Sequence, residues 1–150
     1  RKIDMASSAW ILYNKARKKI VNGTIDLNTS GFRMKMLKGA ASASVSVSTL
    51  SLLSQIGTTN YTANMSTYPL VAATVTAIAA SATHKFTANN IVVTASGGAA
   101  SVQYAVLYTS LSAGGGHMLA WCKLSTAAFA VTSTNTLTVT TPANGFFVIY

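Results

Sequence analysis

The chain has 150 residues, of which 50% are apolar and only 9% are charged, with a formal net charge of +9. This length suits one domain with a single hydrophobic core, and so apolar a composition excludes a disordered chain. Acidic residues are almost absent, because Asp4 and Asp26 are the only two and residues 39–150 contain no carboxylate. Hydrolysis by a pair of carboxylates needs two acids at a defined separation. Asp4 lies in the terminal segment, which we expect to be mobile, and this leaves only Asp26, so a single copy of this chain is not expected to belong to that class of enzyme.

The first predicted element is an amphipathic α-helix over residues 8–22. Ser7 or Ser8 can cap its start, and Asn22 followed by Gly23 supplies a left-handed stop. The apolar side chains recur at the spacing of one helix face. These side chains are Ala9, Leu12, Tyr13, Ala16 and Ile20.

A cluster of basic residues occupies the last two turns of this predicted helix. Lys15, Arg17, Lys18 and Lys19 fall within five positions. Cations near a helix C-terminus are stabilised by the helix dipole by about 0.3–1 kcal/mol each. A solvated, dipole-stabilised helix end is therefore one interpretation, and contact with nucleic acid or with an acidic neighbouring subunit is the other.

Residues 32–37 carry the pattern of a half-buried strand. Phe32, Met34 and Met36 alternate with the residues between them, which is the period of two expected of a β-strand. The same alternation places Arg33 and Lys35 together on the opposite face. There they are either solvated or in contact with a partner.

The remainder of the chain predicts strands separated by turns. Residues 39–60 fit no single period, since 43–47 alternates as a strand does, whereas the next apolar residues have helical spacing and predict a short helix at 49–55. The expected strands after this region are 71–78, 85–87, 91–95, 99–109, 118–124, 136–141 and 145–150. Glycine and asparagine clusters lie between them. The pattern predicts a mainly β fold, an antiparallel, jelly-roll-like β-sandwich with one N-terminal amphipathic helix.

We expect a single domain at 1–150 with three parts. An extended N-terminal arm at 1–7 precedes the helix at 8–22, and a β-rich body follows at 24–150. No Pro- or Gly-rich linker divides this body.

Residue types that carry catalysis or bind metals are scarce. The candidate metal ligands are His84, His117, Cys122 and Asp26, and their spacing matches no metal-site pattern. Cys122 stands in a strand-like run, where a lone cysteine usually serves as a small core hydrophobe. We therefore predict no catalytic residue, no metal ligand, no cofactor and no enzymatic activity.

Several short segments occur in the order known from one protein family. They are YNK at 13–15, NGTIDL at 22–27, FRMKML at 32–37, YTA at 61–63, FTANN at 86–90, YAVLY at 104–108 and NGF at 144–146. Together they resemble a family of small, β-rich virion structural proteins of tailed bacteriophages, over nearly the whole chain. The resemblance implies a structural role in a phage particle and carries over no catalytic residue. Relatives tend to have Asp where Asn28, Asn89 and Asn90 stand here, so their surface charge does not transfer.

Three functions fit these observations. The first is a capsid decoration or cement protein on the capsid exterior, bound to the major capsid protein and to copies of itself in a trimer or dimer. The second is a tail, baseplate or fibre-base component of the same particle. The third, and least favoured, is a nucleic-acid-binding module that uses the basic helix with Arg33, Lys35 and Lys38. Neither a membrane nor a small-molecule substrate is expected as a partner, and partner contacts are predicted at Lys15, Arg17, Lys18, Lys19, Arg33 and Lys35.

Overall fold

The computed structural model describes residues 2–4, 9–28, 31–65, 67–71, 73–77, 83–110 and 116–149. Its strands are β1 (Lys2–Asp4), β2 (Ile11–Leu12), β3 (Phe32–Leu37), β4 (Tyr68–Pro69), β5 (Thr74–Ala77), β6 (His84–Thr87), β7 (Ile91–Thr94), β8 (Ala100–Val102), β9 (Tyr104–Thr109), β10 (Met118–Lys123), β11 (Phe129–Val131), β12 (Thr136–Val139) and β13 (Phe147–Ile149). Its helices are α1 (Asn14–Val21) and α2 (Ser42–Val45), with 3-10 turns η1 (Gly39–Ala41), η2 (Leu53–Ile56) and η3 (Thr58–Asn60). The protein is mainly β, and its described strands pair antiparallel except for β1 and β12, which run parallel.

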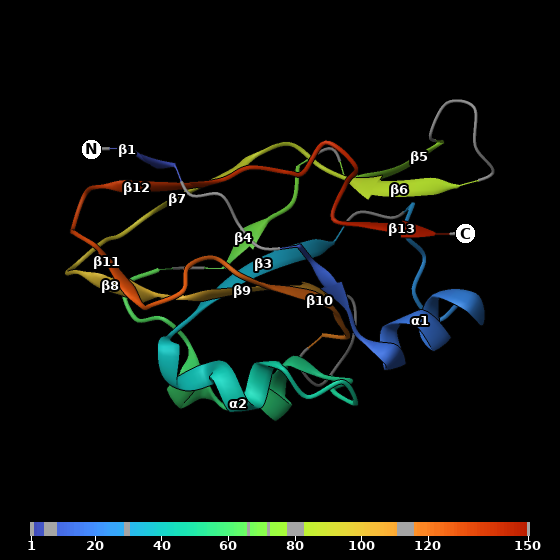
Figure 1. The fold of residues 1–150 in the computed structure, drawn as a ribbon, viewed down its shortest axis with the longest axis horizontal. Coiled ribbons are helices and arrows are strands. Elements are labelled where there is room, and N and C mark those ends of the chain that lie inside the picture. The colour runs from blue at the N-terminus through green and yellow to red at the C-terminus, as the bar shows by residue number, and fades with distance from the viewer. Residues whose placement is uncertain are drawn as a thin grey trace.

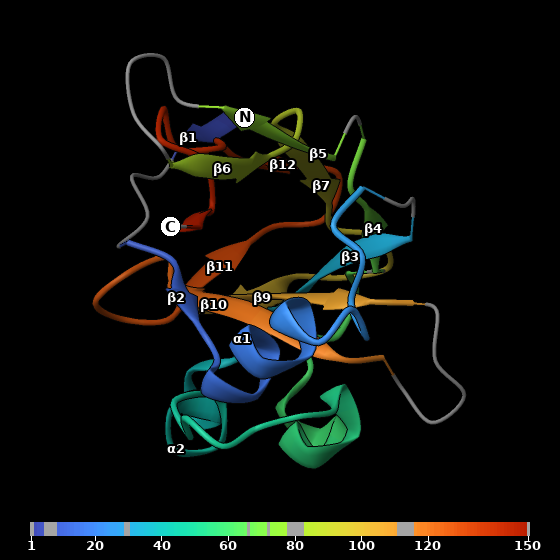
Figure 2. The ribbon, with the colours of Figure 1, turned by 90° about the vertical axis from the view of Figure 1, so that its right-hand side faces the viewer.

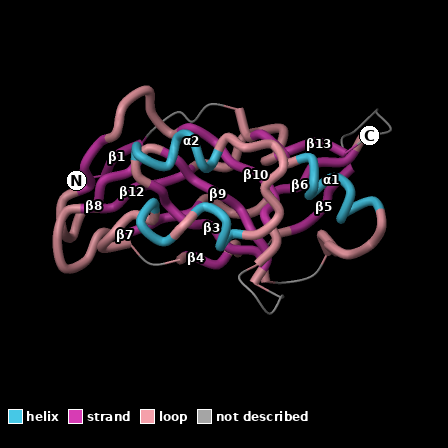
Figure 3. Tube along the Cα trace, turned by 90° about the horizontal axis from the view of Figure 1, so that it is seen from below, coloured by secondary structure: helices cyan, strands magenta, loops and turns pink. Residues whose placement is uncertain are grey.

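The described strands form four sheets. The largest has the order β2-β10-β9-β3-β4, two others have the orders β1-β12-β7 and β13-β6-β5, and β11 pairs with β8. The two three-stranded sheets lie on one side of the five-stranded sheet, and α2 with the 3-10 turns lies on the other (Figures 1 and 2). Helix α1 lies at the end of the molecule that also holds β13 and the C-terminus (Figure 3).

Strand β3 confirms the predicted alternation with the predicted bounds. Phe32, Met34 and Met36 are buried, whereas Arg33 is exposed and Lys35 half-buried. The register places Arg33 opposite Tyr108 and Lys35 opposite Val106. Cross-strand partners share a face, so both basic residues lie on the side of the sheet that α1 and α2 cover.

A separate hydrophobic cluster lies on each face of the five-stranded sheet. Strand β9 alternates between them: Ala105 and Leu107 belong to the cluster toward the three-stranded sheets, and Tyr104, Val106 and Tyr108 belong to the cluster under the helices. The first cluster contains Phe32, Phe86, Phe146, Phe147 and Trp10. Ring centroids lie 5.0 Å apart for Phe32–Phe86 and 5.1 Å apart for Phe86–Phe147 and Trp10–Phe146.

The predicted start of the N-terminal helix is wrong. Helix α1 begins at Asn14 rather than at residue 8, because Ile11 and Leu12 pair with β10 as strand β2. The backbone N–H of Tyr13 also donates to the carbonyl of Leu119 in β10, at 3.0 Å. A short strand that leads directly into a helix continues the same apolar spacing, so periodicity alone cannot locate the boundary.

The predicted end of this helix is confirmed. Asn22 is the C-cap, and its N–H bonds the carbonyl of Lys18 while that of Gly23 bonds the carbonyl of Ile20. Gly23 has a φ of +76°, the left-handed conformation that glycine adopts freely. The predicted caps Ser7 and Ser8 lie outside the described residues.

Other predictions meet mixed outcomes. Every strand expected after residue 70 overlaps an observed strand, but 99–109 forms two strands, β8 and β9, interrupted at Gln103. The side-chain amide of buried Gln103 donates to the carbonyls of Ser125 and Thr126, at 3.3 and 3.0 Å.

The helix expected at 49–55 is wrong in type and start, since η2 is a 3-10 turn that begins at Leu53.

The N-terminal segments and several loops also differ from expectation. Residues 2–4 of the expected arm are extended, but they pair with β12 as β1, and the rest of the arm lies outside the described residues. The strand-like alternation at 43–47 falls largely on helix α2. Strands β4 and β11 carried too few residues to be predicted.

Candidate functional site

A basic pocket of about 470 Å³ lies between α1 and the segment that leads into η2. It is lined by Lys15, Lys18, Lys19, Asn22, Thr24, Thr49, Ser51 and Gln55. The three lysines stand at i, i+3 and i+4 on α1, a spacing that puts them on one helix face. The lining contains three ammonium groups and no carboxylate.

Lys19 is held at the inner side of this pocket. Its Nζ donates to Ser51 Oγ at 2.8 Å and meets His117 Nδ1 at 2.6 Å. An ammonium group can only donate, so Nδ1 is the unprotonated nitrogen of a neutral imidazole. Burial, and then the charge of Lys19, lower the pKa of His117; burial, and then the charge of Lys15, lower the pKa of Lys19.

Two side-chain amides complete the wall of the basic pocket. Asn22 Oδ1 accepts the backbone N–H of Thr24 at 3.1 Å and its hydroxyl at 2.7 Å. Gln55 Oε1 accepts the backbone N–H groups of Ser51 and Leu52, at 2.7 and 2.9 Å. Because backbone N–H groups can only donate, these bonds fix which end of each amide is the oxygen.

The other predicted contact residues lie elsewhere. Arg17 is exposed on α1 and lines an apolar groove rather than the basic pocket. Lys35 is half-buried, donates to Thr67 Oγ1 at 3.1 Å and lies 4.6 Å from the ring centroid of Tyr61; burial lowers the pKa of Lys35. Arg33 is exposed on β3 opposite Pro69 of β4. The structure thus brings together Lys15, Lys18 and Lys19 in one pocket, which Arg17, Arg33 and Lys35 do not line.

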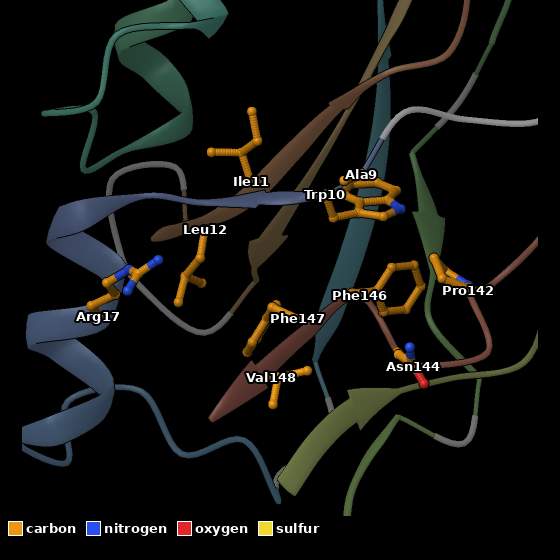
Figure 4. Close-up of a pocket in the computed structure, with 11 residues that line it drawn as sticks. Ala9, Trp10, Ile11, Leu12, Arg17, Pro142, Asn144, Phe146, Phe147 and Val148 are labelled. Carbon is orange, nitrogen blue, oxygen red and sulfur yellow. The ribbon is translucent and has the colours of Figure 1, made fainter. Parts of the chain in front are cut away.

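The apolar groove lies between β2 and β13. One hollow of about 470 Å³ and one of about 250 Å³ share Leu12, Arg17 and Val148 in their walls. Figure 4 shows Trp10 and Leu12 facing Phe146, Phe147 and Val148 across it, with Arg17 entering from α1. Beyond these residues the wall includes Ala9, Ile11, Ile20, Val21, Pro142, Asn144, Gly145 and Ile149.

Both strands that flank the apolar groove are sheet edges among the described residues. Strand β2 pairs on one side with β10, and β13 pairs on one side with β6. Trp10 is 8% exposed, and its indole Nε1 has no hydrogen-bond partner in the described part of the chain. Ile11 and Val21 at the rim are 49% and 88% exposed. The groove therefore offers apolar side chains beside two strands that are sheet edges among the described residues.

The described residues contain no group of three His, Cys, Asp or Glu side chains that could hold a metal ion. Cys122 is buried in the core cluster as predicted, and burial raises the pKa of its thiol. None of the helices in the described ranges is both long and apolar enough to cross a membrane.

Sequence reasoning identified the lysines of the basic pocket but neither the pocket nor the groove. The i, i+3, i+4 spacing of Lys15, Lys18 and Lys19 was the available signal that they share a face without Arg17. The apolar groove joins residues 9–21 with 142–149, and no periodicity within either segment predicts that contact.

Comparison of the chain with protein-family models, with curated proteins and with solved structures finds no match.

Proposed function

We propose that this chain is a structural protein of a tailed-bacteriophage particle, a capsid decoration or cement protein that binds the major capsid lattice and stabilises it. Its partners are the major capsid protein and further copies of itself, on the capsid exterior. The proposal includes a jelly-roll-like sandwich arrangement of the sheets. It assigns the protein an assembly role rather than a catalytic one.

The apolar groove is the observation that carries this proposal. Exposed strand edges present unpaired N–H and C=O groups, which are a template for pairing with another chain. Here two such edges, β2 and β13, flank hollows lined by Trp10, Leu12, Phe147 and Val148. A neighbouring subunit that inserts an extended segment would pair with an edge and cover the apolar wall.

The charge distribution fits a surface that other subunits cover. Residues 39–150 carry Lys85 and Lys123 as their only side chains with a full charge at neutral pH. Permanent interfaces are depleted of charged residues, whereas an isolated soluble domain normally keeps a charged surface. The β-rich body therefore has the composition of a surface covered in an assembly.

The direct test is the copy number of this chain in purified particles, measured by quantitative mass spectrometry against the major capsid protein. A ratio near one per capsid subunit is expected for a lattice-covering cement protein. A few copies per hundred capsid subunits would move the protein to the tail, baseplate or a vertex. Absence from particles would overturn the virion proposal.

A paired substitution tests the groove itself. Val148→Arg places a charge in both hollows of the groove, whereas Val92→Arg places the same charge on β7, where the valine is 54% exposed and lines neither hollow. We expect particles that lack the protein to take up the wild type and Val92→Arg but not Val148→Arg. Both variants must first show the wild-type circular dichroism spectrum, so that a folding defect is not read as lost assembly. Equal uptake of both variants would show that the groove is not part of the interface with the particle.

A further inference from the structure

We infer that the basic pocket between α1 and η2 binds a phosphate group, either free or esterified. This inference concerns a different surface from the apolar groove and does not depend on the virion proposal. It rests on a count of the hydrogen-bond donors and acceptors that the pocket wall leaves unused.

The internal hydrogen bonds of the pocket wall consume its amide oxygens and leave its amide nitrogens. Asn22 Oδ1 takes two bonds from Thr24, and Gln55 Oε1 takes two from the backbone of Ser51 and Leu52. Each side-chain NH₂ group then offers two N–H donors. Ser51 Oγ accepts from Lys19 Nζ, so its own hydroxyl hydrogen is available for donation.

The pocket groups that donate no side-chain hydrogen bond within the described ranges are therefore still available as donors. They are the ammonium groups of Lys15 and Lys18, the amide NH₂ groups of Asn22 and Gln55, and the hydroxyls of Thr49 and Ser51. A phosphate presents three or more strong acceptor oxygens, and donors on both α1 and the facing segment can reach different oxygens of one group. A carboxylate has only two oxygens and would use fewer of these donors.

The electrostatic balance also favours an anion, despite an opposing helix dipole. Lys18, Lys19 and Asn22 lie at the C-terminal end of α1, where the dipole contributes roughly half a negative charge, whereas Lys15 lies in the first turn. Three lysine ammonium groups outweigh that half charge. The wall contains no carboxylate to neutralise them, so an anion that enters the pocket meets no repelling side chain of like charge.

The test is titration of the full ¹⁵N-labelled chain with inorganic phosphate, followed by NMR at constant ionic strength. Saturable shifts are expected in the backbone amides of Ser51 and Leu52 and in the side-chain NH₂ signals of Asn22 and Gln55. Acetate, a carboxylate probe, is expected to bind at least several-fold more weakly. Shifts that grow linearly, or that sodium chloride reproduces, would overturn the inference, and acetate binding as tight as phosphate would overturn its ligand class.

Matched variants locate the site. Lys18→Gln removes a pocket charge and is expected to weaken phosphate binding by about tenfold, the loss typical of one charge-assisted hydrogen bond. Arg17→Gln removes the same charge from the neighbouring position, which does not line the pocket, and is expected to change affinity less than about twofold, since exposed charges at a distance are screened. Equal losses in both variants would mean a general charge effect and would overturn the site.

Gln55→Glu tests the donor count directly. The carboxylate can still accept the N–H groups of Ser51 and Leu52, but it replaces the free NH₂ group with a negative oxygen. Phosphate binding should be lost while the fold, checked by circular dichroism, is retained. Phosphate affinity unchanged from the wild type would contradict the inference.

A second titration identifies the source of the phosphate. A short single-stranded thymidine oligonucleotide presents esterified phosphates on a chain, whereas inorganic phosphate presents a free one. Oligonucleotide binding that Lys18→Gln weakens, beyond the effect of Arg17→Gln, would assign the pocket to nucleic acid. Saturable binding of inorganic phosphate alone would assign it to a free anion, and binding of neither probe would overturn the inference.

Discussion

The two faces of the five-stranded sheet are built from different kinds of side chain. Toward the three-stranded sheets, Phe86 packs against Phe32 and Phe147 with ring centroids 5.0 and 5.1 Å apart. Toward α1 and α2, the buried aromatic residues carry hydroxyl groups, and that of Tyr13 donates to the carbonyl of Val45 at 2.7 Å. The first face is thus stabilised by buried volume, and the second by buried volume together with specific hydrogen bonds.

This difference separates the two candidate sites. The apolar groove continues the aromatic cluster to the surface at Trp10 and Phe146. The basic pocket lies on the helical side, beside the hydrogen-bonded Lys19 and His117. We call the face toward the three-stranded sheets the aromatic face and the face toward α1 and α2 the helical face. Mutations on the aromatic face should therefore act through packing at any pH, whereas mutations on the helical face should act through individual polar partners.

Phe86→Ala should lower the free energy of unfolding more than any other substitution proposed here. It tests whether the aromatic face depends on close packing. Phe86 is fully buried and contacts the rings of Phe32, Phe146 and Phe147. Truncation of such a residue removes buried area and leaves a cavity, so the free energy of unfolding should fall by about 3–5 kcal/mol. Urea unfolding measures this loss. Val92→Ala, at an exposed strand position, is the control and should change stability by less than about 0.5 kcal/mol; a similar small change for Phe86→Ala would show that this face does not depend on volume.

Gly145→Ala tests how closely the loop at Gly145 packs against Phe86 on the aromatic face. Gly145 has a φ of +75°, and a Cβ there would clash with the carbonyl oxygen of Phe86. Gly23 has nearly the same φ, +76°, with nothing within 4 Å of its added Cβ. Gly23→Ala should cost about 1–2 kcal/mol for the left-handed backbone alone, and Gly145→Ala should cost about 1–3 kcal/mol more because it also overpacks the site. Equal losses in thermal or urea unfolding would mean that the loop at Gly145 moves away without cost.

Tyr13→Phe tests the hydrogen bond that distinguishes the helical face. Burial raises the pKa of Tyr13, so its hydroxyl stays protonated and donates to Val45. Removal of the hydroxyl leaves a buried carbonyl without this donor and should cost about 1–3 kcal/mol. Tyr61→Phe is the control, because the Tyr61 hydroxyl is part-buried and donates to the carbonyl of Leu53 at 3.2 Å. It should cost about 0.5–1.5 kcal/mol, and the same loss for Tyr13→Phe would indicate that the helical face gains no more from its buried bond.

Sequence patterns predicted local features of both faces, but not the contacts between segments that are distant in the chain. Strand β3 was predicted with its bounds, since its alternation of apolar and basic residues is a period-2 signal within six positions. The stop of α1 at Gly23 was predicted for a similar local reason. The start of α1 was not, because the boundary depends on pairing of β2 with β10, more than 100 residues away in the chain.

The candidate sites divide in the same way. The lysines of the basic pocket are clustered within one helix, so their sequence spacing identified them. Ser51 and Gln55, on its other wall, are brought to α1 only by tertiary packing. Within the described residues the indole Nε1 of Trp10 has no hydrogen-bond partner, and this property of the folded chain has no sequence pattern.

His117→Gln should give the smallest effect. It tests whether one polar contact of the helical face, between His117 and Lys19, contributes to stability in a pH-dependent way. Burial and the charge of Lys19 lower the pKa of His117 below its usual 6.5, so the unfolded chain binds more protons than the folded chain below that pH. The free energy of unfolding should therefore fall as the pH decreases from about 6.5 toward the lowered pKa of the folded state. Because solvent screens this part-buried pair, the loss should stay below about 1 kcal/mol. The chain has only two side-chain carboxylates. Carboxylates ordinarily titrate near pH 4, so they contribute little between pH 7 and 5.

Urea unfolding at several pH values between 7 and 5 measures this effect in the wild type and in two variants. Glutamine at position 117 stays neutral and can accept from Lys19 Nζ, so His117→Gln should remove most of the slope. His84→Gln, at the exposed start of β6, should keep it. If His117→Gln retained the wild-type slope while His84→Gln lost it, the pH dependence would belong to the β13-β6-β5 sheet, and the polar character assigned to the helical face would be wrong.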